Sequence, residues 1–321
     1  MERKGCGCAT GIMVWVIVIL LILLGVGFVL GPIGANILGL ETPSSFDVSK
    51  PHFQLPAEEL FHVGPFSITN TLMASWLTIL VLVVTFYIFT RKMKLIPGRL
   101  QGIAEMAVEG LLNFMEGPAG KKNARLFFPL VATIFIYVIA NAYLGLMPFF
   151  GPVGIIESDG SFVPLLRPAN TDINLTLSIA IMSFVFVETW GMRSSGVFRY
   201  MGQFFNVGQI GRGIKQLFGG RIRPALGNVG LGFINLFVGL LELLSHFIRI
   251  VSFTFRLFGN MTAGEILLLV VGFLIPLVAI IPFYGLELLV GFIQALIFAG
   301  LTLVFGIIAV APMHEGEEQE A

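Results

Sequence analysis

Five ionisable side chains stand in a stretch of sequence that is otherwise almost wholly apolar. Between Leu231 and Leu274 these residues are Glu242, His246, Arg249, Arg256 and Glu265. A charged group deep in a membrane carries a high free-energy cost, and such groups line ion or proton pathways or pair with one another. The residue types and their placement therefore indicate a pathway for ions or protons, or a set of structural ion pairs.

The spacing of these residues predicts a helix with one polar face. At about 100° per residue, most of them fall within roughly 40° of Glu242 around the helix axis, and Glu265 lies about 140° away. The other members of this polar stripe are His246, Arg249, Arg256 and Asn260. The helical pattern runs for about 40 residues, or ~60 Å, against a hydrocarbon core of ~30 Å. It must break near Gly259 or lie tilted, and we expect one long tilted helix.

Two further segments carry polar residues at informative positions. The last apolar stretch, Leu286 to Val310, contains Glu287 and Gln294, which are seven residues apart and so share a helix face. Upstream, the string from Asn170 to Asn174 includes Asp172 and has the form of a helix N-terminus with an acidic first turn.

The composition places all these elements in a membrane. Of 321 residues, 56% are hydrophobic and 12% are charged, and the mean hydropathy is +0.92, which is more apolar surface than a soluble core can bury. Lys and Arg together number 19, and so do Asp and Glu together. The chain therefore has no net charge that would favour binding to nucleic acid. We predict an all-α integral membrane protein with about five to six membrane helices, two of them long and tilted near the C-terminus.

The distribution of Lys and Arg orders the spans, because these residues accumulate on the cytoplasmic side. The predicted spans are 12–30, 68–89, 126–147, one that ends at Trp190, and an outward and an inward pass within 229–311. Basic clusters at 91–99 and 193–223 and the acidic C-terminal tail are then cytoplasmic. Residues 100–116 have apolar side chains at helical spacing among polar ones, which predicts an interfacial amphipathic helix.

Three regions follow from this order. Residues 1–38 form a signal anchor or a signal peptide, and the length of the apolar run favours an anchor. Residues 39–66 form an extracytoplasmic segment, and residues 67–321 form the membrane domain. Cys6 and Cys8 both precede the first apolar run, so they indicate neither a disulfide framework nor a zinc site.

Several other functions are compatible with charges in a membrane. Arg256 paired with Glu265 or Glu242 would hold helices together without conduction. A voltage sensor is disfavoured because no regular basic repeat surrounds Arg249 and Arg256. An ion-coupled secondary transporter should show an internal repeat, and none is visible. The sequence has no phosphate-binding loop and no metal-spaced histidine cluster, so no catalytic residue, cofactor or metal is predicted.

Sequence motifs narrow these alternatives. The segment RLFGNMTAGE at 256–265 resembles the signature of subunit a of F-type ATP synthases. The resemblance extends to ANAYLGLMPF at 140–149, TDINLTLS at 171–178, GLELLVGFIQALIFAGLT at 285–302 and a phenylalanine-rich motif at 61–71. It implies a non-catalytic subunit with two proton half-channels that couples proton flow to ATP synthesis. The implied partners are a ring of c subunits, peripheral-stalk b subunits and the lipid bilayer, with protons as the transported ion.

The resemblance also assigns roles to individual residues. Those implied in proton translocation are Arg256, Glu265, Glu287, Gln294, Asn260, Glu242, Ser252, His246, Asp172 and Asn174. Arg256 matches the arginine that faces the ring carboxylate. Asn260, Glu265 and Gln294 would flank the extracytoplasmic half-channel, with Asp172 and Asn174 near its entrance. Glu242 and Ser252 would lie toward the cytoplasmic path.

One position departs from the pattern of the family. Glu287 stands where many bacterial members have a histidine, so Glu265 and Glu287 could serve one channel and titrate as a coupled pair if close. The implied setting is a bacterial inner membrane, crossed several times, with the C-terminus in the cytoplasm. The coupling ion is expected to be H⁺ rather than Na⁺, although the sequence of this chain does not itself select the ion.

Overall fold

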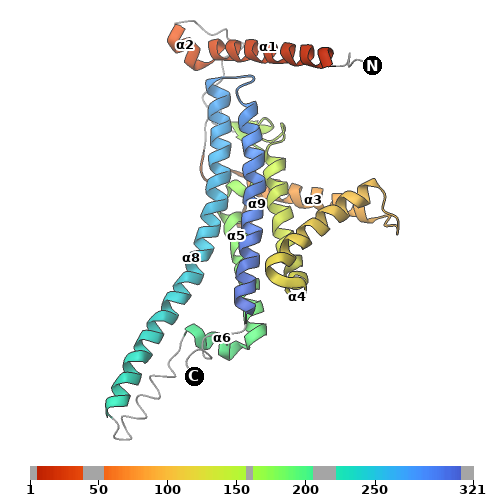
Figure 1. Ribbon diagram of the computed structural model, residues 1–321. Coiled ribbons are helices and arrows are strands. Elements are labelled where there is room, and N and C mark those ends of the chain that lie inside the picture. Colours follow the sequence, from red (N-terminus) through yellow and green to blue (C-terminus); the bar gives the residue numbers. More distant parts are fainter. Residues whose placement is uncertain (1–5, 39–53, 157–161, 205–221, 312–321) are drawn as a thin grey trace. The chain divides into compact units, whose positions relative to one another are not determined.

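The computed structural model describes residues 6–38, 54–156, 162–204 and 222–311, and within them the chain is mainly helical (Figure 1). Five of the described helices are long and apolar enough to cross a membrane. They are α3 (Asn70–Thr90), α4 (Arg99–Gly145), α5 (Ile173–Ser195), α8 (Ile222–Leu274) and α9 (Ile281–Val310). The prediction of an all-α integral membrane protein is confirmed.

The N-terminal part of the chain forms α1 (Cys6–Leu30) and the short α2 (Pro32–Leu38). Most apolar side chains of α1 are exposed, as expected for a helix that meets lipid or another chain. Its C-terminal end packs closely, because a Cβ at Gly27 would collide with the backbone carbonyl of Pro276. Whether α1 is an anchor or a cleaved signal stays a prediction, as does the division at residues 38 and 66.

Two short β-hairpins lie outside the long helices. β1 (Glu59–Val63) pairs with β2 (Phe66–Thr69), and β3 (Gly154–Ile156) pairs with β4 (Phe162–Pro164), both antiparallel. Gly64 adopts φ +64° in the turn of the first hairpin, a left-handed conformation that glycine tolerates without a Cβ clash. The sequence pattern did not predict these strands, because each is too short to show clear alternation of polar and apolar residues.

α4 consists of two helical segments that meet at a kink. Gly120 has φ 71° and ψ 158°, which interrupts the helix two residues after Pro118, and Figure 1 shows the change of direction. The first segment covers the predicted amphipathic helix, and the second covers the span predicted at 126–147. Leu111 and Met115 of the first segment are buried in a core cluster with Phe127 of the second. The interfacial position of the first segment stays a prediction.

α8 is a single helix of 53 residues, with no break at Gly259. At 1.5 Å per residue its length is about 80 Å, well beyond a hydrocarbon core of ~30 Å. The prediction of one long helix is therefore confirmed, and its tilt stays a prediction. After α8 the chain turns through Leu277, which has a positive φ of 80°, and α9 begins at Ile281.

The contacts divide the chain into two compact units. The first unit contains residues 1–76, 141–171 and 259–293, and the second contains residues 77–140, 172–258 and 294–321. In the first unit the end of α8 and the start of α9 run side by side in opposite directions (Figure 1). In the second unit Phe127 packs on Trp190 with ring centroids 4.4 Å apart, at the centre of the core cluster.

Candidate functional site

An arginine and a glutamate form a closely paired charge cluster in the first unit. The Nε atom of Arg167 donates to both carboxylate oxygens of Glu265 at 3.2 Å, and Nη2 donates to Oε2 at 3.0 Å. The Arg167 side chain is 5% exposed and that of Glu265 is 20% exposed. Such a two-pronged contact between a guanidinium and a carboxylate is both strong and geometrically specific.

The loop that carries Arg167 is held at several points. The Nη1 atom of Arg167 donates to the backbone carbonyls of Gln54 at 2.7 Å and Pro56 at 3.3 Å. The next residue, Pro168, packs so tightly on Gly145 that a Cβ there would overlap the proline ring at 2.7 Å. Thr171 donates its hydroxyl to the carbonyl of Pro168 at 2.7 Å. The position of the guanidinium is therefore held by contacts other than its ion pair with Glu265 as well.

Glu287 lies beside the same cluster, on α9. A Cβ placed on Gly264 would collide with the Glu287 carboxyl group, so the two helices approach closely because residue 264 has no side chain. A cavity of about 140 Å³ is lined by Arg167, Glu265 and Glu287, together with Tyr284 and further apolar residues. This space is large enough for several water molecules. The structure therefore brings together the two acids that the sequence assigned to one channel.

The second unit contains a separate polar cluster around His246. Its Nδ1 lies 2.6 Å from Oε1 of Glu188, and the hydroxyl of Tyr200 donates to Oε2 of the same carboxylate at 2.8 Å. Tyr200 comes from α6 (Val197–Phe204) and packs on Gly191, where a Cβ would meet its ring at 2.5 Å. His246 was predicted as a site residue, whereas Glu188 and Tyr200 were not.

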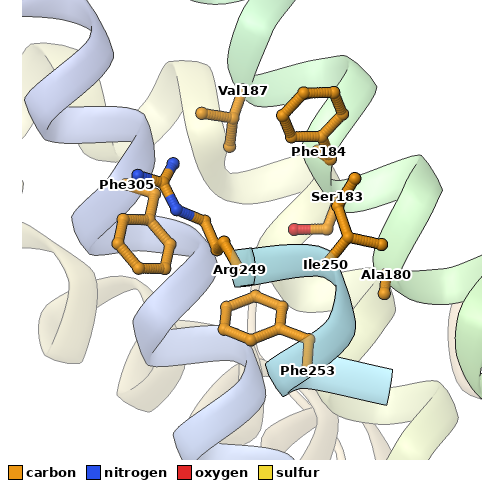
Figure 2. Close-up of a pocket in the computed structure, with 8 residues that line it drawn as sticks. All are labelled: Ala180, Ser183, Phe184, Val187, Arg249, Ile250, Phe253 and Phe305. Carbon is orange, nitrogen blue, oxygen red and sulfur yellow. The ribbon is translucent and has the colours of Figure 1, made fainter. Parts of the chain in front are cut away.

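Arg249 lies one turn along α8 from His246. Its guanidinium carbon lies 3.6 Å from the centroid of the Phe305 ring, which is a cation–π contact. Figure 2 shows this pair, with Ser183 and Val187 of α5 lining the same small pocket. Within the described part of the second unit, the guanidinium of Arg249 therefore contacts an aromatic ring and makes no direct contact with a carboxylate.

Arg256 has a different environment. Its Nη2 donates to Oγ of Ser252 at 3.3 Å, and the side chain is partly exposed. Among the residues that the structure describes, no carboxylate lies within 4.0 Å of its guanidinium. One hypothesis from the sequence was that Arg256 pairs with Glu265 or Glu242 and only holds helices together. In the structure Glu265 pairs with Arg167, and Glu242 is exposed.

The other predicted site residues are distributed over both units. Asn260 is exposed on α8 in the first unit. In the second unit, Gln294 is 2% exposed on α9, and Asp172 is the N-cap of α5. The Asp172 carboxylate accepts from the backbone N–H of Asn174 at 2.9 Å, which confirms the predicted helix start. The predicted acidic first turn is wrong, because Asp172 is the N-cap and the first turn of α5 contains no acidic residue. The residues of the polar stripe of α8 lie in different environments, because His246 and Arg249 contact neighbouring helices whereas Glu242 is exposed.

Sequence reasoning missed two ionisable residues that the structure places at the centre of the clusters. Glu188 is the only acidic residue of α5, so the criterion that selected the charges of α8, an isolated ionisable group among apolar residues, would have found it. Arg167 stands in a loop rich in glycine and proline, and no pattern there indicates a partner 98 residues away.

Taken together, the helices and the two clusters define a multi-pass α-helical membrane protein with ionisable groups among its apolar helices. The family model described as ATP synthase A chain matches residues 72–306. Three relatives named ATP synthase subunit a are also similar. The one from Campylobacter jejuni subsp. doylei is 31% identical over 76% of this chain and 86% of its own length. That from Moorella thermoacetica is 28% identical over 77% and 93%, and that from Gloeobacter violaceus is 31% identical over 75% and 84%. The chain belongs to the ATP synthase subunit a family.

Proposed function

We propose that this chain is the non-catalytic subunit that conducts protons through the membrane sector of an F-type ATP synthase, with Arg256 as its gate. The observation that carries the proposal is the state of Arg256. It is a partly exposed cation on a membrane-spanning helix, and no described carboxylate lies within 4.0 Å of it. An unpaired charge in a membrane is costly, so a carboxylate from another subunit is the natural partner.

A guanidinium suits this gate because it keeps its charge at every pH that the cell reaches. Arg256 attracts a ring carboxylate only when that carboxylate is ionised. Each ring carboxylate must therefore lose its proton before it moves past Arg256. Arg256 itself accepts and releases no proton. Protons consequently cannot leak directly from one half-channel to the other, and their flow is coupled to rotation of the ring.

The remaining site residues border the two half-channels. Glu265, Glu287, Asn260 and Gln294 border the extracytoplasmic path, and Asp172 and Asn174 lie near its entrance. Glu242, His246 and Ser252 border the cytoplasmic path. The cavity between Arg167, Glu265 and Glu287 supports the first assignment, because it places water-accessible space beside two carboxyl groups. The transported ion in this proposal is H⁺.

The assembly follows from the same function. A ring of c subunits supplies the carboxylates that meet Arg256, and peripheral-stalk b subunits hold the chain against rotation. The many exposed apolar side chains of α8 are consistent with contact to lipid and to other subunits. The chain resides in a bacterial cell membrane with its C-terminus in the cytoplasm.

The test is ATP-driven proton pumping in membrane vesicles that carry Arg256→Ala, compared with the passive proton leak after the soluble catalytic sector is removed. Pumping should be lost while the leak persists or increases. Arg91→Ala is the matched control, because Arg91 is an exposed arginine at the end of α3 and should leave pumping at its normal level. Normal pumping by Arg256→Ala would refute the proposal.

A further inference from the structure

The imidazole of His246, in the second unit, is held by groups from two neighbouring helices, α5 and α6. Its Nδ1 lies 2.6 Å from Oε1 of Glu188, and the side chain is 12% exposed. Phe184 of α5 and Phe204 of α6 stand edge-on to the imidazole, with ring centroids 6.2 Å and 5.2 Å from it. The ring is therefore held in one orientation, with Nδ1 turned toward the carboxylate.

Both oxygens of the Glu188 carboxylate are engaged. Oε1 faces Nδ1 of His246, and Oε2 accepts from the hydroxyl of Tyr200 at 2.8 Å. Tyr200 is itself fixed, because it is buried and its ring fills the space that a Cβ at Gly191 would occupy. An ionised carboxylate can only accept hydrogen bonds, so the short contact with His246 requires the hydrogen of the neutral imidazole to be on Nδ1.

This arrangement leaves Nε2 as the ring nitrogen that can change its protonation. Within the ranges that the structure describes, no residue is hydrogen-bonded to Nε2 of His246. A proton that binds there produces an imidazolium, whose positive charge the Glu188 carboxylate balances at 2.6 Å. Loss of the same proton restores the neutral ring with its hydrogen on Nδ1. Histidine suits such a transfer, because its ordinary pKa lies close to neutrality.

Few other charged or titratable groups face this pair from the described helices. They are Tyr200 of α6, and Arg249 and Glu242 of α8 itself. Arg249 acts on Glu188 through its charge without direct contact, and Glu242 is exposed one turn before His246. An arginine keeps its proton, and the Tyr200 hydroxyl is bound to Glu188. His246 is therefore the member of this cluster that is suited to carry a proton at neutral pH.

We infer that His246 binds and releases protons at Nε2 in the cytoplasmic path, and that Glu188 and Tyr200 are positioning residues that keep its other hydrogen on Nδ1. The inference rests on the proposed function and adds to it two residues and the reacting atom. His246 is ten residues before Arg256 on α8, about 15 Å along the helix axis, so water must carry the proton between the ring carboxylate and Nε2. During ATP synthesis each proton that arrives at Nε2 leaves from Nε2 to cytoplasmic water, and the Nδ1 hydrogen stays bonded to Glu188.

His246→Asn separates this role from a purely structural one. The amide nitrogen of asparagine can donate to Glu188 from about the place of Nδ1, but the side chain has no group that binds a proton in place of Nε2. ATP-driven pumping in membrane vesicles, with subunit amounts equalised by immunoblot, should fall by about tenfold or more. His62→Asn is the matched control, because His62 is an exposed histidine of β1 and its replacement should leave pumping normal. Normal pumping by His246→Asn would overturn the inference.

Tyr200→Phe provides a second test should His246→Asn fail to assemble. It keeps the ring against Gly191 and removes only the hydroxyl that donates to Glu188. The passive proton flux of inside-out vesicles without the soluble catalytic sector is measured against the pH on the cytoplasmic face. The pH of half-maximal flux should move in this variant, because the carboxylate that faces His246 has lost a donor. An unchanged midpoint would overturn the inference, since a structural contact changes only the size of the flux. Arg256→Ala, measured in parallel, is the separate check on the proposed function.

Discussion

The close approach of α8 and α9 at Gly264 predicts that Gly264→Ala impairs proton transport without unfolding the subunit. A Cβ at this position would overlap the carboxyl group of Glu287. The colliding atoms are the far end of a flexible side chain, so the carboxyl group can rotate away instead of forcing the helices apart. An off-rotamer side chain costs about 0.5–1.5 kcal/mol, which a folded subunit tolerates.

The functional effect should be larger than the effect on stability. Moving a reacting group by about 1 Å can cost on the order of 100-fold in rate. We therefore expect the initial rate of ATP-driven acidification of vesicles to fall at least tenfold at equal amounts of assembled subunit. The helices themselves should remain in place, and the yield of the detergent-solubilised complex should remain close to that of the natural chain.

Two variants sharpen this experiment. Gly285→Ala is the matched control, because the described residues leave nothing within 4 Å of the added Cβ, and it should pump normally. Gly264→Ala combined with Glu287→Asp shortens the colliding side chain by one methylene and should recover part of the lost rate. If Gly264→Ala alone pumps at the normal rate, the position of the Glu287 carboxyl group does not matter and the reasoning is wrong.

The second unit gives two further predictions. Glu188→Gln weakens the contact with His246 and should destabilise the subunit by about 1–3 kcal/mol, seen as a lower melting temperature of the solubilised complex. The exposed Glu109→Gln is its control, and an unchanged melting temperature of Glu188→Gln would contradict the pairing. Asp172→Ala removes the N-cap of α5 and should cost about 1 kcal/mol, whereas Asp172→Asn should cost little, by the same measurement. Equal losses from both substitutions at 172 would show that capping is not the cause.

The long helices were predictable from sequence because their signal is local. Each of these signals lies within one short segment of the sequence: a run of apolar residues, a basic cluster at its end, or an N-cap such as Asp172. The continuity of α8 through Gly259 was predictable for the same reason, since one glycine costs a helix only about 1 kcal/mol. The two hairpins were not, because strands of three to five residues depend on pairing partners that the local pattern does not reveal.

The candidate site was only partly predictable. Helical spacing identified His246, Arg256 and Glu265 as polar positions, because intramembrane charges are rare enough to stand out. It could not identify their partners, since the Arg167 loop and the Glu188 helix reach them through tertiary packing. A helical wheel also assigns a face to each residue but does not say which neighbouring element covers that face. Arg249 and Glu242 share an angle on α8, yet one meets Phe305 and the other is exposed.

The ion pair between Arg167 and Glu265 has a consequence for the order in which the protein is made. The two residues are 98 positions apart, so at about 5–20 residues per second the ribosome needs roughly 5–20 seconds to add the second after the first. During that interval Glu265 is not among the partners of the arginine, whereas the carbonyls of Gln54 and Pro56 have already been made. The contact between Arg167 and Glu265 can therefore form only after this part of α8 has been made. A nascent chain that stops before α8 therefore lacks the carboxylate that pairs with Arg167 in the finished subunit.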